Sequence, residues 1–86
     1  MTSEDIVNKI IDCADIILNK YNKASLYCLD HHTNEFFALL KKQLQVPNDN
    51  LLLDIVNNNG VLNRLKSYNY YNIILLFAGL SKRLDN

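Results

Sequence analysis

Residue types that bind metal ions lie close together near the middle of the chain: Cys28, His31, His32 and Glu35, with Cys13 further upstream. Thiolate sulfur and imidazole nitrogen are the usual ligands of structural zinc, which needs four of them around one ion. The spacing lacks the C-x-x-C pair of zinc fingers, and a cysteine among apolar residues is usually a small core residue. We therefore predict no metal site and no cofactor, with the two histidines exposed in a connecting loop.

Residues for covalent or acid–base catalysis do not form a recognisable set. Cys28 beside a histidine would need a lowered thiol pKa and a third group that orients the histidine, and no candidate for that group is present. Asp12 and Asp15 lie one helical turn apart on a face that we expect to be solvated. The glycines, Gly60 and Gly79, form no phosphate-binding loop. We therefore predict that the protein is not an enzyme.

A DNA-binding surface is one candidate, on residues 51–68. Two short apolar segments separated by Asn57-Asn58-Asn59-Gly60 resemble a helix-turn-helix in outline. The second segment would present residue types that contact base edges and phosphates: Asn63, Arg64 and Lys66. The net charge is +0 and the pI about 6.7, whereas nucleic-acid-binding domains are usually basic. Nucleic acid is therefore the alternative partner.

The leading candidate is the polar face of the first predicted helix. Ile16 is expected there among acidic and amide neighbours, which is the composition of a small apolar centre with a polar rim. The proposed partner-binding residues are Asp5, Asp12, Asp15, Ile16 and Asn19. Residues 1–40 carry three Lys and six acids, whereas residues 41–86 carry six basic residues and three acids. We therefore predict a protein partner with a basic surface.

Three tyrosines, Tyr68, Tyr70 and Tyr71, provide a second group of residues that is common at protein interfaces. Packing of their rings in the core, with the hydroxyl groups at the surface, is the simpler explanation.

Hydrophobic periodicity predicts an all-α fold that positions these residues. Apolar residues recur at helical spacing, and breakers are few, with two Gly and one Pro. Helices are expected at 1–22, 24–30, 34–45, 51–58, 61–68 and 70–84. The last is apolar over most of its circumference but too short to span a bilayer, which needs about 20 apolar residues. We predict a compact single domain, residues 1–86, of five or six helices around this C-terminal helix, with no membrane association.

Composition and size narrow the class of protein. Two cysteines and no leader-like pattern at the start predict a reduced, cytoplasmic protein. Thirteen Asn, together with the Ile, Lys and Tyr residues, indicate an AT-rich gene from a virus, a mobile element or a low-GC bacterium. In size and helical character, the chain resembles small toxin immunity proteins, phage-encoded inhibitors and compact adaptor domains. This resemblance covers no alignable motif, and it implies a non-enzymatic protein that binds or inhibits a protein partner. A structural subunit of a homo-oligomer is a further alternative.

Overall fold

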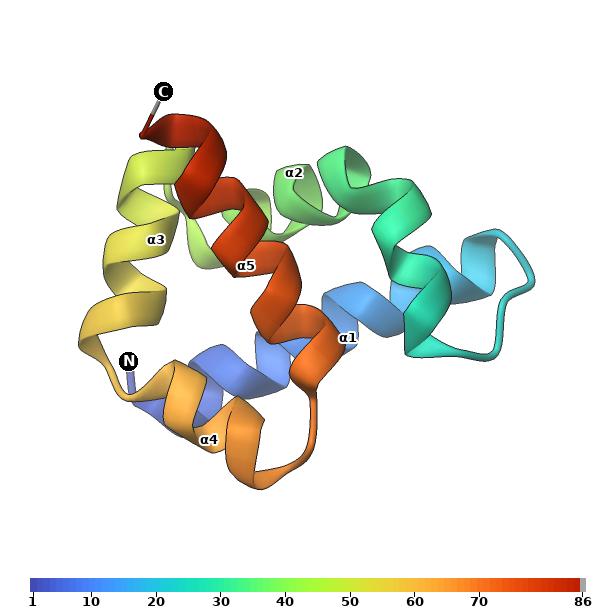
Figure 1. The fold of residues 1–86 in the computed structure, drawn as a ribbon, viewed down its shortest axis with the longest axis horizontal. Coiled ribbons are helices and arrows are strands. Elements are labelled where there is room, and N and C mark those ends of the chain that lie inside the picture. The colour runs from blue at the N-terminus through green and yellow to red at the C-terminus, as the bar shows by residue number, and fades with distance from the viewer. Residues whose placement is uncertain (86) are drawn as a thin grey trace.

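The computed structural model describes residues 1–85, and this part of the chain folds into five α-helices and one 3₁₀ helix, without strands (Figure 1). In chain order these are α1 (Ser3–Lys20), the 3₁₀ helix η1 (Leu26–His32), α2 (Thr33–Leu44), α3 (Asp49–Asn58), α4 (Val61–Ser67) and α5 (Tyr71–Leu84). They form one unit with extents of 32 × 28 × 22 Å. The predicted compact all-α bundle is therefore confirmed. No helix in this range is long and apolar enough to cross a lipid bilayer.

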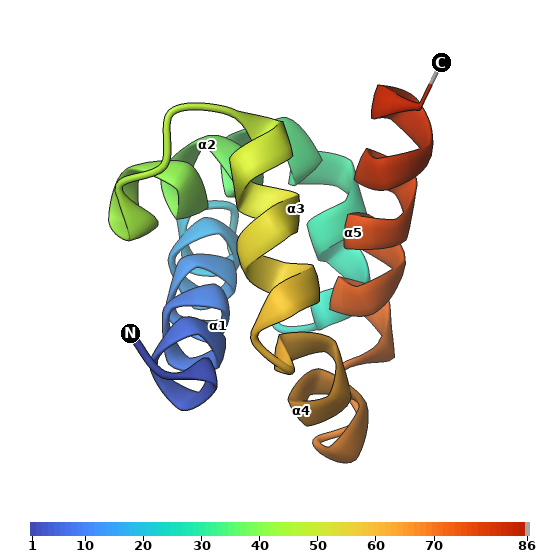
Figure 2. The same cartoon turned by 90° about the vertical axis from the view of Figure 1, so that its left-hand side faces the viewer.

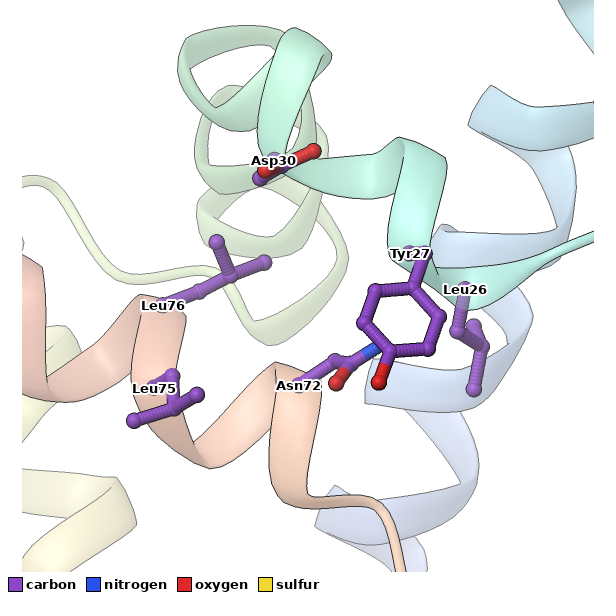
Figure 3. Close-up of a pocket in the computed structure, with 6 residues that line it drawn as sticks. All are labelled: Leu26, Tyr27, Asp30, Asn72, Leu75 and Leu76. Atoms are coloured by element: carbon purple, nitrogen blue, oxygen red, sulfur yellow. The ribbon is translucent and has the colours of Figure 1, made fainter.

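The core lies between α1 and α5, which occupy opposite sides of the molecule (Figure 2). α1 packs against α2, α4 and η1, and it buries more residues than any other helix: Ile6, Val7, Ile10, Cys13, Ala14, Ile17 and Leu18. α5 buries only Ile73, Phe77 and Leu80. Leu75 is 68% exposed, at the edge of a shallow pocket that Leu26 and Tyr27 of η1 also line (Figure 3).

The position of α5 therefore corrects one detail of the prediction, because this helix is an outer wall of the bundle and not its centre. The elements packed against α5 are α3, α4 and η1, with two phenylalanine rings of α2, and they cover only one side of it. Because α5 is apolar over most of its circumference, the side that no neighbouring element covers is an apolar face in contact with solvent.

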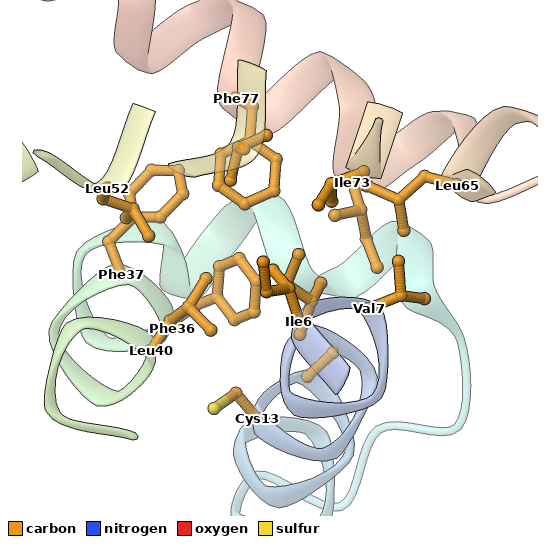
Figure 4. Close-up of a cluster of buried hydrophobic side chains, with 14 of the residues drawn as sticks. Ile6, Val7, Cys13, Phe36, Phe37, Leu40, Leu52, Leu65, Ile73 and Phe77 are labelled. Atoms are coloured by element: carbon orange, nitrogen blue, oxygen red, sulfur yellow. The ribbon is translucent and has the colours of Figure 1, made fainter. Parts of the chain in front are cut away.

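Three phenylalanine rings join α2 to α5 inside the core (Figure 4). The centroids of Phe36 and Phe37 are 5.4 Å apart, and those of Phe37 and Phe77 are 5.6 Å apart. Such tilted contacts are preferred by aromatic pairs. Phe36 has no exposed surface (0%), so the aromatic cluster lies inside the core, where it connects the two halves of the chain.

Three helices end with a residue in the left-handed conformation that is not glycine: Asn22, Gln45 and Asn69. After α4, Tyr70 N–H donates to the Leu65 carbonyl at 2.9 Å and Asn69 N–H donates to the Lys66 carbonyl at 3.0 Å. These two bonds form a Schellman motif, which satisfies the last carbonyl groups of a helix. The chain reverses there, and the reversal places Tyr68 and Tyr70 on either side of one tight turn.

The segment 24–30 is helical, but its form and its end differ from the prediction. It is a 3₁₀ helix that Ser25 caps, since the Ser25 side chain accepts a hydrogen bond from Tyr27 N–H at 3.2 Å. It continues through His31 and His32 directly into α2. The prediction that these histidines lie in a connecting loop is therefore wrong.

Candidate partner-binding groove

The cysteines and histidines do not gather around a common point. Cys13 is buried in the core, Cys28 is partly buried against it, and both thiols are free. Within residues 1–85, no three His, Cys, Asp or Glu side chains are placed to hold one metal ion. The zinc arrangement that the sequence raises is therefore not formed by these side chains.

Glu35 and His32 instead connect the end of α1 to the start of α2. The Glu35 carboxylate accepts hydrogen bonds from Lys20 Nζ and from the Tyr21 hydroxyl, the latter at 2.6 Å. The His32 ring stacks on Tyr21 with centroids 3.8 Å apart. The hydrogen bonds from Lys20 and then Tyr21 hold the pKa of Glu35 below its usual range. This surface cluster fixes the two helix ends relative to each other.

Because its pKa is lowered, Glu35 stabilises the fold at pH values above its unfolded pKa of about 4.3, and this contribution is lost as pH falls through the folded pKa. The Glu35→Gln variant should therefore be slightly less stable than wild type at neutral pH, and the difference should shrink below about pH 4.5. Urea unfolding over this range measures it. Asp54→Asn, at an exposed carboxylate of α3, is the control. A wild-type-to-Glu35→Gln difference that stays constant with pH would contradict the assignment.

The five residues that the sequence analysis proposes for partner binding all lie exposed on α1. Asp5 also takes part in capping this helix. Its backbone N–H donates to Thr2 Oγ1 at 3.1 Å, while its carboxylate accepts from Thr2 N–H at 3.2 Å. This capping box satisfies amides at the start of the helix, and the Thr2 hydrogen bonds lower the pKa of Asp5. Asp15 and Asn19 face solvent.

Ile16 lies in a shallow groove between α1 and α2 and is 51% exposed. Leu39 and Ala38 supply apolar surface on the α2 side, and Lys20 and Lys42 border it. Glu35 lines the groove as well, so the surroundings of Ile16 on this side carry both signs of charge and are not the purely acidic ones expected.

Asp12 lines a different groove, formed by α1 and the turn between α4 and α5. This groove has a volume of about 450 Å³ and is lined by Glu4, Val7, Asn8, Ile11, Asp12, Tyr68 and Tyr70. The rings of Tyr68 and Tyr70 pack edge to face with centroids 6.1 Å apart. The structure thus brings together the acidic helix face and the tyrosines, which the sequence could present only as separate candidates.

The groove suits a lysine or arginine side chain. Ile11, which is only partly buried, offers apolar surface to the aliphatic part of such a side chain. Lysine and arginine readily bury this part while the charged end stays in water. The Asp12 carboxylate offers a charge-assisted hydrogen bond, and the face of a tyrosine ring attracts a cation. Asp12 has no ion-pair partner among residues 1–85, so its charge is available to a ligand.

Arg64, from the alternative nucleic-acid surface, is held by the start of α1. Its Nε donates to Ser3 Oγ at 2.6 Å and its Nη1 donates to Glu4 Oε2 at 2.7 Å. Asn63 and Lys66 remain exposed on α4. The side chain best suited to bidentate contact with a base is therefore engaged with the start of α1, although it stays 43% exposed. The same bridge anchors α4 on α1 and so maintains the groove.

Some groove residues could be recognised only in part from the sequence. Glu4, Asn8 and Asp12 follow one another at a spacing of four residues, which puts them along one edge of a helix. Nothing in that spacing indicates that tyrosines more than fifty positions later lie opposite this edge.

No family model matches this chain, and comparisons with curated proteins and with solved structures found no match. The function must therefore be argued from the side chains that line the groove and from their charges.

Proposed function

We propose that this protein is a non-enzymatic binding protein, which holds a basic segment of a protein partner in the groove between α1 and the Tyr68–Tyr70 turn. One observation carries the proposal: the Asp12 carboxylate and both tyrosine rings line the same groove. A cytoplasmic location and an inhibitory, immunity or adaptor role are parts of the same proposal. An inhibitor of this kind would act by covering a basic site on its partner.

The chemistry of the groove favours a segment with more than one basic residue. A cation over an exposed aromatic face contributes about 0.5–1 kcal/mol, and a hydrogen bond to a charged group about 1.5–3 kcal/mol. Asp15 lies one turn beyond Ile11 on the same edge of α1, so it can receive a second basic side chain. We expect a single short peptide to bind weakly and a folded partner, with its larger contact area, to bind more tightly.

The test is a titration of ¹⁵N-labelled protein with a short, end-blocked peptide of alternating Arg and Gly, followed by NMR. We expect shift changes at Asn8, Asp12, Tyr68 and Tyr70, with affinity that falls as salt is added because the contacts are charged. Asp12→Asn combined with Tyr68→Ala should weaken binding by about tenfold or more, from the loss of both contacts.

Two controls keep this test specific. Asp54→Asn removes an exposed carboxylate from α3 and should leave peptide affinity unchanged, and a peptide of alternating Glu and Gly should not bind. If the Asp12→Asn, Tyr68→Ala variant binds the basic peptide within about twofold of wild type, the groove is not the site. Shifts at Asn63 and Lys66 on addition of duplex DNA would favour the nucleic-acid alternative.

A further inference from the structure

The outward face of α5 is apolar and uncovered in the part of the chain that the structure describes. Tyr71 is 50% and Leu75 68% exposed, and Ala78 and Gly79 on the next turn are exposed as well. A shallow pocket of about 200 Å³ adjoins this face between α5 and η1, lined by Leu26, Tyr27, Asp30, Asn72, Leu75 and Leu76 (Figure 3). Large apolar side chains gathered on one face mark an interaction surface.

We propose that this face pairs with the same face of a second copy of the chain, in an antiparallel dimer with two-fold symmetry. The first reason is shape. Leu75 projects from the helix, and one turn later Gly79 lines a shallow pocket, where a Cβ would meet no atom within 4 Å. A two-fold axis that crosses the paired helices at the level of Phe77 places Leu75 of each copy opposite Gly79 of the other. The contact between Leu75 and Gly79 therefore forms twice.

The second reason is charge. The same axis puts Lys82, which is exposed, opposite Asn72 of the other copy. Tyr71 lies at that end of the face and is half exposed, so the lysine meets an aromatic ring, whose face attracts a cation. A parallel arrangement would instead place the two Lys82 side chains together. The net charge of +0 removes general repulsion between copies.

The length of α5 sets the size of this interface. Fourteen residues make a helix about 21 Å long, so two paired α5 helices with the edges of η1 bury less than the roughly 800 Å² per copy of an ordinary stable interface. We therefore expect a dissociation constant on the order of 10–100 µM. α1 lies on the opposite side of the molecule, so its polar face stays exposed in the dimer (Figure 2).

Sedimentation equilibrium of the whole chain from about 5 to about 500 µM tests the proposal. Gly79→Gln is the decisive variant, because Gly79 has a helical backbone and open space around it. The substitution should raise the melting temperature of the monomer by a few degrees, since glycine disfavours helix. It should also fill the space at Gly79 and raise the dissociation constant about tenfold or more. Leu75→Arg should have the same effect on association.

Leu51→Arg serves as the matched control, because Leu51 is a similarly exposed leucine (42%) on α3. A dimer that is lost in Gly79→Gln and Leu75→Arg and kept in Leu51→Arg supports the proposal. A wild-type protein that stays monomeric at about 500 µM overturns it, and the face then belongs to a different occupant. A dimer whose dissociation constant changes less than twofold in both α5 variants also overturns it.

Discussion

Replacing Phe36 with alanine is expected to lower the free energy of unfolding by about 3–5 kcal/mol. Phe36 has no exposed surface (0%) and contacts the rings of Phe37 and Phe77 from within the core. A chain of this length has a total stability of roughly 4–13 kcal/mol. The variant should therefore lose about a quarter or more of its stability, and at the lower end of this range it would be largely unfolded at room temperature. Urea denaturation followed by circular dichroism measures the change.

Tyr27→Ala is the control for this core substitution, since it also removes an aromatic ring but from a side chain that is 77% exposed. Its cost should stay within about 0.5 kcal/mol. The comparison should be made at a few micromolar protein, where the proposed dimer is dissociated. A loss below about 1 kcal/mol for Phe36→Ala would mean that the aromatic cluster does not hold α2 against α5 as described.

The two thiols should differ more than about a hundredfold in their rate of reaction with Ellman's reagent near pH 8. Cys13 is 1% exposed, and burial raises its pKa to about 11. At such a pKa only about one thiol in a thousand is ionised near pH 8, and the thiolate is the reactive form. Cys28 is partly exposed on η1, so it should react first and alone in the native protein.

Cys28→Ala should therefore abolish the fast phase, and Cys13→Ala should leave it intact. The slow reaction of Cys13 should speed up in urea, because it requires opening of the core. If both thiols react at similar rates in native protein, α1 is not packed with Cys13 toward the core.

The helices and their ends could be predicted because they depend on neighbours within one or two turns. Thr2 caps α1 and Asn48 caps α3, because their side chains accept hydrogen bonds from Asp5 N–H and Leu51 N–H. Gly60, between α3 and α4, has a left-handed φ of 69°, which glycine adopts without strain. The spacing of apolar residues could not distinguish a 3₁₀ helix from an α-helix at residues 26–32, because both forms bury similar residues over one or two turns.

The environment of α5 could not be predicted in the same way. A helix that is apolar nearly all round has no preferred buried side in its own sequence, so the neighbours decide which side chains lose contact with water. Those neighbours are α3, α4 and η1, together with the phenylalanine rings of α2 that contact Phe77, and they leave Leu75 exposed while Phe77 is buried.

The sequence by itself determined the helices, the acidic face of α1 and the aromatic character of the turn before α5. Only the tertiary structure decided that Asp12 and Tyr68, which are 56 positions apart, line one groove. A helical pattern sets the direction of each side chain relative to its own axis, whereas the packing of α4 on α1 sets which faces meet. The buried Val61 and Leu65, with the Arg64 bridge to Glu4, determine that packing.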